Sequence, residues 1–200
     1  MKKTVTALLV LAGILYMCAE KKPTVKNFPR PVEKIVAFGD SLTAGYGGGG
    51  AQNAYPAILA NLSGKEVINE GLSGDTASHA PARLPDVLKH EPDMVLIEFG
   101  ANDYMRGLSQ AAAVSAVAQV VDAVQETGAV AVIVDTAGPG MSGYTQAYKK
   151  LAREKQAVFV PGIMKGIFYK PSLKSDAIHP NAKGYERVAR HVYKHIKAYL

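Results

Sequence analysis

Five short apolar runs, separated by helical stretches, are the feature that most restricts how this chain of 200 residues can fold. The runs at 94–97 and 129–134 are apolar at every position, which is typical of strands that are covered on both faces. Strands are predicted at 34–38, 66–69, 93–99, 129–136 and 157–161, and helices at 53–62, 108–128, 142–156 and 181–200. The alternation predicts a three-layer α/β fold: a doubly wound, flavodoxin-like parallel sheet of five strands with helices on both faces.

The amino terminus has the pattern of an export signal. Met-Lys-Lys precedes a mostly apolar stretch that is shorter than the ~20 apolar residues of a membrane-spanning helix. We expect a signal peptide or lipoprotein signal at 1–19, a proline-rich linker at 20–33 and one domain at 34–200. The only cysteine, Cys18, resembles in its position the lipid-modified cysteine of bacterial lipoproteins. The expected location is the periplasm, the cell envelope or the extracellular space, with a membrane tether through the amino-terminal segment or Cys18 as one option.

The net charge of +6 is concentrated at the amino terminus, where residues 1–34 carry seven Lys or Arg against two Asp or Glu. Residues 35–200 are therefore almost neutral and offer no basic surface of the kind that binds nucleic acid. We expect no nucleic-acid partner, and instead a monomer that acts on a small molecule.

Polar segments follow three of the five strands, and a fourth segment precedes the last helix. The three are GDSLTAGYG at 39–47, EGLSGDTA at 70–77 and GANDY at 100–104, and the fourth is SDAIHP at 175–180. Because parallel strands end at one edge of a sheet, we expect the first three segments to lie together there, with the fourth folding back to them.

Side chains in these segments are the ones that acyl transfer requires. Ser41 is the predicted nucleophile, His179 the base that takes its proton, and Asp176 the carboxylate that orients His179 three residues later. Main-chain N–H groups of Ser41 and Gly74 and the side-chain amide of Asn102 are the predicted donors to the oxyanion.

With these four segments the chain resembles the SGNH or GDSL hydrolases, from about residue 34 to its end. GDSLTAGYG, GLSGDTA, GAND and DAIHP are similar to blocks of that family and occur in its order. YPAIL, ARLP and the stretch from AYKKLA to KPSL most resemble the branch of bacterial thioesterase I, arylesterase and lysophospholipase. The resemblance implies the SGNH hydrolase fold, the roles given above to the site residues, and cleavage of acyl esters or thioesters without metal or cofactor.

The segment TAGPGMSGY at 136–144 follows the fourth strand and is expected to border the acyl-binding groove. Pro139, Met141 and Tyr144 are therefore the predicted substrate-binding residues. We expect no metal site, because no H-E-x-x-H pattern occurs. The other histidines also have no carboxylate placed as Asp176 is to His179, and we expect them to be surface or satisfied helix residues: His79, His90, His191 and His195.

Two other interpretations remain open at this point. Gly45, Gly47 and Gly50 match the spacing G-x-G-x-x-G, and Glu70 ends the second strand about twenty residues later, so a dinucleotide-binding α/β module is one alternative. The glycines do not follow the first strand directly, which weighs against it. A catalytically inactive envelope scaffold of the same fold is the other.

Overall fold

The computed structural model describes residues 24–200. The predicted export signal at 1–19, Cys18 and the first part of the linker lie outside the described residues. Within residues 24–200, no helix has both the length and the apolar character to cross a membrane.

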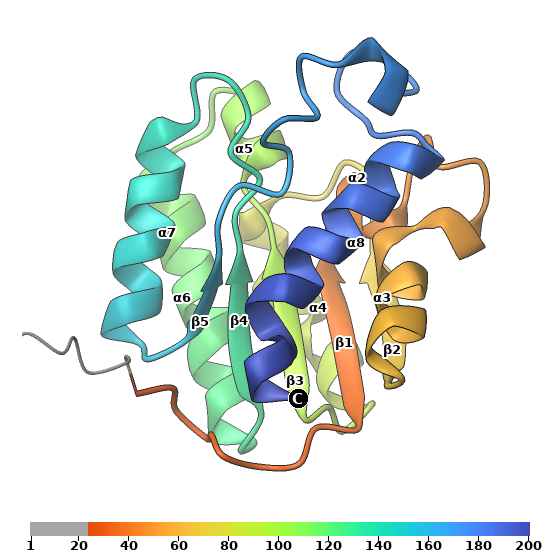
Figure 1. Cartoon of the computed structure of the whole chain (residues 1–200). Helices are drawn as coiled ribbons and strands as arrows, with labels where there is room; N and C mark the ends of the chain where they lie inside the picture. Colours follow the sequence, from red (N-terminus) through yellow and green to blue (C-terminus); the bar gives the residue numbers. More distant parts are fainter. Residues whose placement is uncertain (1–23) are drawn as a thin grey trace, which may run out of the picture.

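The centre of the molecule is a parallel sheet in the order β2-β1-β3-β4-β5. Its strands are β1 (Lys34–Gly39), β2 (Glu66–Gly71), β3 (Met94–Glu98), β4 (Val130–Val134) and β5 (Val158–Val160). In the register of the sheet Gly39 lies beside Gly71 on one side and Glu98 on the other, so three strands end at the same level. The loops that follow these strands meet at one edge of the sheet, which is uppermost in Figure 1.

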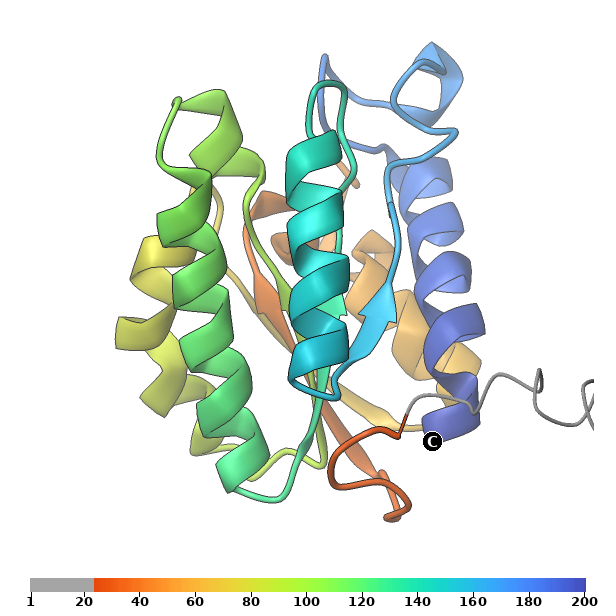
Figure 2. The same ribbon diagram turned by 90° about the vertical axis from the view of Figure 1, so that its left-hand side faces the viewer.

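Helices cover both faces of this sheet. The α-helices of the described residues are α2 (Ser41–Ala44), α3 (Tyr55–Ser63), α4 (Ala80–Leu88), α5 (Ala101–Met105), α6 (Gln110–Glu126), α7 (Ser142–Glu154) and α8 (Ala182–Ile196). Short 3₁₀ helices are η1 (Ala51–Asn53), η2 (Ala77–His79), η3 (Pro171–Leu173) and η4 (Lys197–Tyr199). Helices α3 and α8 pack on one face and α4, α6 and α7 on the other, as the turned view of Figure 2 shows. The predicted three-layer fold is confirmed.

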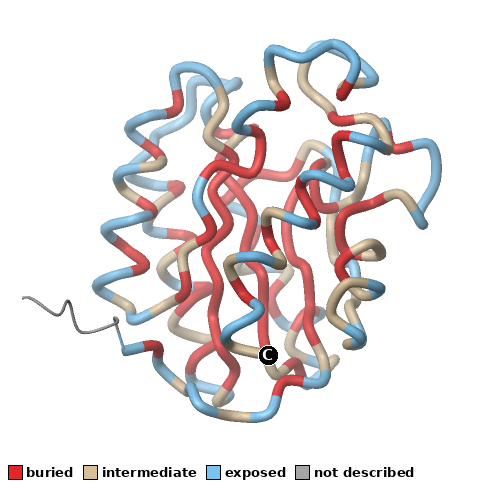
Figure 3. Tube along the Cα trace, viewed as in Figure 1, coloured by how far each residue is buried: buried red, intermediate tan, exposed pale blue. Residues whose placement is uncertain are grey.

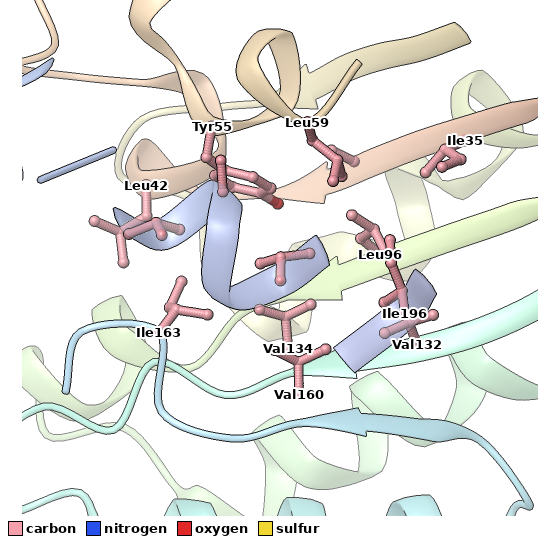
Figure 4. Close-up of a cluster of buried hydrophobic side chains, with 14 of the residues drawn as sticks. Ile35, Leu42, Tyr55, Leu59, Leu96, Val132, Val134, Val160, Ile163 and Ile196 are labelled. Atoms are coloured by element: carbon pink, nitrogen blue, oxygen red, sulfur yellow. The ribbon is translucent and has the colours of Figure 1, made fainter. Parts of the chain in front are cut away.

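Alternate residues of β1 point into two separate apolar cores. Ile35 and Ala37 pack toward α3 and α8, whereas Val36 and Phe38 pack toward α4 and α6. All four are fully buried, as expected for a strand between two helical layers. Figure 3 shows the buried strands at the centre of the trace, and Figure 4 shows the first core around Tyr55, Leu59 and Leu96.

The described part of the expected linker, 24–33, packs against the amino-terminal edge of the sheet. Val25 and Val32 are buried in the first core. The Asn27 side-chain amide donates to the carbonyls of Gln125 and Ala129, at 2.8 Å each, and Arg30 forms an ion pair with Asp93 at 2.5 Å. The boundary expected at Lys34 therefore leaves out a segment that packs against the domain. The sequence did not reveal it, because two isolated valines give no periodic signal.

Candidate active site

The first polar segment places Ser41 at the start of α2, directly after β1. Asp40 caps this helix: its Oδ1 accepts the Leu42 N–H at 2.9 Å. The helix lasts only four residues and ends at Gly45, whose φ of 83° is in the left-handed region that glycine favours. Ser41 is thus held in a tight turn at the carboxyl end of the central strands.

Ser41, His179 and Asp176 form one hydrogen-bonded line, although Ser41 and His179 lie 138 residues apart in the chain. Ser41 Oγ lies 3.0 Å from His179 Nε2, and His179 Nδ1 lies 2.8 Å from Asp176 Oδ2. Asp176 Oδ1 also accepts the N–H groups of Ile178 and His179, at 2.9 and 2.8 Å. These distances are those of a nucleophile, a base and an orienting carboxylate.

The Asp176 carboxyl group is held in its charged form. Partial burial opposes the charge, but the two N–H groups and the His179 ring outweigh it and lower the pKa of Asp176 to about 2. Asp176 therefore stays an acceptor for His179 over the whole range in which proteins normally work.

Asn102, the predicted side-chain donor to the oxyanion, already has hydrogen-bond partners. Asn102 Nδ2 donates to Asp40 Oδ2 at 3.0 Å and to the Asp75 carbonyl at 2.9 Å. Gly74, with a φ of 82°, occupies a turn closed by the Asp75 N–H and the Leu72 carbonyl at 3.1 Å. The Asn102 amide therefore ties the Asp40 cap to this turn, and it must share a proton to serve an oxyanion.

The sequence analysis missed a buried acid next to Asp40, the residue that precedes Ser41. Glu98 is fully buried at the end of β3, where its two oxygens accept the hydroxyls of Thr43 and Thr136 at 3.0 and 2.9 Å. Burial raises the pKa of Asp40 well above its usual range, and the neighbouring Glu98 charge raises it further. Burial also raises the pKa of Glu98, although hydrogen bonds with Thr136, Asp40 and Thr43 lower it in part. The sequence did contain a sign of this buried acid, because Glu98 stands in an otherwise apolar strand.

Two arginine side chains hold the turn that contains Gly74. The sequence analysis did not single them out. Arg106 donates to the Gly74 carbonyl at 2.7 Å, and Arg83 donates to Asp75 Oδ2 at 2.6 Å. Asp75 also accepts the Thr76 N–H at 3.0 Å, and Asp103 accepts the Ala77 N–H at 2.9 Å. Both acids hold main-chain groups of the turn and do not contact Ser41 or His179 in these bonds.

A mostly apolar cavity of about 140 Å³ opens beside Ser41 and His179. Pro139 and Met141, two of the three predicted substrate-binding residues, line it. Tyr144 does not line it, because its ring is buried beneath the loop, edge-on to the rings of Tyr104 and Tyr148. Other lining residues, which the sequence analysis did not name, include Leu42, Ala101, Tyr104, Met105, Met164, Phe168 and Ile178.

Two histidines outside this site have carboxylate partners, at spacings other than the three residues between Asp176 and His179. His79 Nδ1 lies 3.1 Å from Asp75 Oδ1, and His90 Nε2 lies 2.7 Å from Glu70 Oε1. Among residues 24–200, no group of three or more His, Cys, Asp or Glu is arranged to hold a metal ion.

The glycine pattern of the dinucleotide alternative falls in the wrong place. Gly45, Gly47 and Gly50 follow α2, whereas a dinucleotide fingerprint lies between a strand and its helix. Glycine is needed here for other reasons: all three have positive φ, and Gly45 ends α2.

Comparisons with known proteins find hydrolases of similar sequence and the same fold. The model of the GDSL-like lipase/acylhydrolase family matches residues 37–187. An arylesterase of Vibrio mimicus is 33% identical over 181 residues, which cover 82% of this chain and 90% of that protein. A protein of Escherichia coli named thioesterase 1/protease 1/lysophospholipase L1 is 33% identical over 175 residues, covering 82% and 84%. The crystal structure of TesA superposes with a TM-score of 0.78 at 26% identity, covering 84% of this chain and 99% of that one.

Proposed function

Because the chain belongs to the GDSL-like lipase/acylhydrolase family, we propose that it hydrolyses acyl esters through a covalent intermediate on Ser41. The observation that carries the proposal is the continuous line from Ser41 Oγ through His179 to Asp176, with distances of 3.0 and 2.8 Å. A serine hydroxyl is a weak nucleophile until a positioned base takes its proton, and this line supplies that base.

The geometry supports a two-step reaction. Ser41 Oγ attacks the ester carbonyl carbon while His179 Nε2 takes the hydroxyl proton, and Asp176 stabilises the imidazolium that forms. The negative oxygen is received by the N–H groups of Ser41 and Gly74 and by Asn102. Collapse of this tetrahedral intermediate breaks the bond between the acyl carbon and the leaving oxygen, and the leaving alcohol takes the proton from His179. Water then attacks the acyl-serine, with His179 again as base, and releases the acid.

The size of the cavity beside Ser41 favours substrates with a short acyl chain. Pockets for drug-sized ligands are about 300–1,000 Å³, whereas this cavity is about 140 Å³. Its walls are apolar side chains such as Met141 and Phe168, which suit an alkyl group. Among the activities in the names of the relatives, arylesterase suits this size best, and thioesters and lysophospholipids are the other substrate classes that we propose.

We also propose that the protein is exported, and that residues 1–19 direct it. Cys18 is the residue through which a lipid tether would be attached. These proposals depend on the sequence pattern of the amino terminus alone. Mass spectrometry of the protein isolated from its cells tests both, since cleavage before Lys34 or a lipid on Cys18 would be read directly.

The first experiment measures hydrolysis of p-nitrophenyl acetate, butyrate and octanoate by the wild type, Ser41→Ala and Ser73→Ala. Ser73 is an exposed serine in a glycine-rich turn and serves as the matched control. We expect activity on acetate and butyrate that falls at least about a thousandfold in Ser41→Ala and stays in Ser73→Ala.

Each other outcome removes a different part of the proposal. A preference for octanoate would overturn the short acyl chain and leave the serine mechanism in place. No hydrolysis of any ester by the folded protein would overturn the esterase function and favour the inactive scaffold.

A further inference from the structure

The ring of Tyr46 packs against the ring of His179, on the loop that follows α2. The ring centroids lie 4.6 Å apart and the planes are tilted by 54°. Tyr46 nevertheless remains 56% exposed, so much of its surface is open to solvent beside the imidazole. A large aromatic side chain held in this way offers an apolar face to whatever enters the site next to His179.

Main-chain contacts fix the position of Tyr46. Its N–H donates to the Ser41 carbonyl at 3.0 Å, and its carbonyl accepts the hydroxyl of the buried Tyr185 at 2.7 Å. The next residue, Gly47, is so close to the His179 loop that a Cβ there would lie 2.0 Å from Ser175 Oγ. The ring therefore belongs to a segment clamped between the nucleophile and the histidine, and its exposure does not come from a loose loop.

Leu72, which follows β2, is a second exposed apolar side chain close to α2 in the fold. It is 51% exposed, and its N–H donates to the carbonyl of Gly39 at 3.0 Å, two residues before the nucleophile. The preceding Gly71 packs against α2, since a Cβ there would lie 2.1 Å from the Ala44 nitrogen. Leu72 is thus fixed next to the turn that carries Ser41.

Neither of these two side chains is among the residues that line the cavity. The strand order places β2 on one side of β1 and β3, β4 and β5 on the other. Leu72 follows β2, and Tyr46 follows α2, which packs against β2. Most of the residues that line the cavity follow β3, β4 and β5, such as Tyr104, Met141 and Phe168. Figure 1 shows the loop after α2 on the opposite side of the upper edge from α5 and the loop after β4.

We propose that Tyr46 and Leu72 form a subsite for the leaving group of the ester, and that this group is an aromatic alcohol. The inference rests on the proposed function, in which the acyl chain occupies the cavity and His179 protonates the leaving oxygen. A leaving group next to His179 and outside the cavity lies against Tyr46. A flat aromatic ring matches the exposed face of Tyr46 better than a short alkyl group does, and such ring pairs are worth about 0.5–1.5 kcal/mol beyond area burial.

The test compares two esters that share one acyl group, 1-naphthyl butyrate and ethyl butyrate, in the wild type and in Tyr46→Ala, Tyr46→Phe and Leu72→Ala. The measured quantity is the ratio of kcat/KM for the naphthyl ester to kcat/KM for the ethyl ester. We expect the ratio to fall about tenfold in Tyr46→Ala and a few fold in Leu72→Ala, mainly through KM, and to persist in Tyr46→Phe, which keeps the ring. Tyr199→Ala, at the opposite end of the molecule, is the control and keeps the wild-type ratio.

A second readout does not depend on the chemical step. Free 1-naphthol should inhibit the hydrolysis of ethyl butyrate competitively, with a Ki about tenfold higher in Tyr46→Ala than in the wild type or Tyr46→Phe. If Tyr46→Ala lowers the rates of both esters equally and leaves the Ki unchanged, Tyr46 only positions His179 and the subsite is overturned. If neither ester is hydrolysed even by the wild type, the proposed function itself has failed, which is a different result.

Discussion

At the scale of single residues, Asn102 has two tasks that can be separated. Its amide connects Asp40 to the Asp75 carbonyl in the free site, and in the reaction it is the proposed side-chain donor to the oxyanion. A donor that is already oriented by other bonds costs little reorganisation when the negative charge develops.

Replacing Asn102 by Ala should lower kcat by about a hundredfold or more, with a small change in KM, because the donor acts in the transition state. Steady-state kinetics on p-nitrophenyl butyrate measures this. Thermal unfolding of the same variant reports on its structural task. A lower melting temperature with an unchanged kcat would mean that Asn102 has a structural role only and does not donate to the oxyanion.

Burial of Glu98 should make the free energy of unfolding depend on pH. The pKa values of Asp40 and Glu98 are raised on folding, so the folded state binds protons that the unfolded state has lost. Their contribution is therefore favourable below pH ~4, near the unfolded pKa, and is lost as the pH rises through the folded values. Glu98→Gln keeps the shape and removes one of the two acids.

We expect Glu98→Gln to gain stability relative to the wild type as the pH rises from ~4 to 8, by up to about 1.4 kcal/mol per pH unit within the titration range. Urea unfolding at several pH values measures the difference. Glu126→Gln, at an exposed position in α6, is the control and should show no such trend. A constant difference for Glu98→Gln would mean that the pair does not titrate on unfolding.

At the scale of elements, the apolar runs were sufficient to predict all five strands, and the rule that parallel strands end at one edge placed the first three polar segments together. Helix α4 was missed because it contains Pro81 and Pro85, which normally argue against a helix. Burial of Ala80, Leu84 and Val87 against the sheet outweighs that preference. Arg106 could not be linked to Gly74 from the sequence, because no local pattern connects residues 32 positions apart.

The loop of four consecutive glycines at 47–50 allows two matched substitutions to be compared. Gly47 and Gly49 have similar φ values of 84° and 78°, so alanine meets the same backbone strain at both. A Cβ at Gly47 would lie 2.0 Å from Ser175 Oγ, whereas a Cβ at Gly49 has its nearest neighbour at 3.9 Å.

Gly47→Ala should therefore lower kcat/KM by about tenfold or more, because it displaces the loop that carries His179, whose geometry the reaction requires. Gly49→Ala should change the melting temperature slightly and kcat/KM little. The two variants are compared on one p-nitrophenyl ester. Equal losses in both would show that backbone strain, and not contact with the His179 loop, determines the effect.

At the scale of the whole molecule, residues 24–33 extend the packed unit beyond the predicted domain. Val25 and Val32 are buried there, and each is worth about 1.5–3 kcal/mol as an upper range. A chain of residues 34–200 should unfold at a temperature at least roughly 5 °C below that of residues 24–200. Calorimetry of the two chains decides this, and equal melting temperatures would restore the boundary at Lys34.

The same segment lies at the end of the molecule opposite the candidate active site. The described chain begins at the lower end of the molecule in Figure 1, whereas α2, which starts at Ser41, lies at the upper edge of the sheet. On a chain held to a membrane through the proposed tether at Cys18, the opening would point away from the bilayer, separated from it by the length of the sheet. Such an enzyme would draw its esters from the surrounding water, and lipids in its own membrane would lie on the wrong side of the molecule.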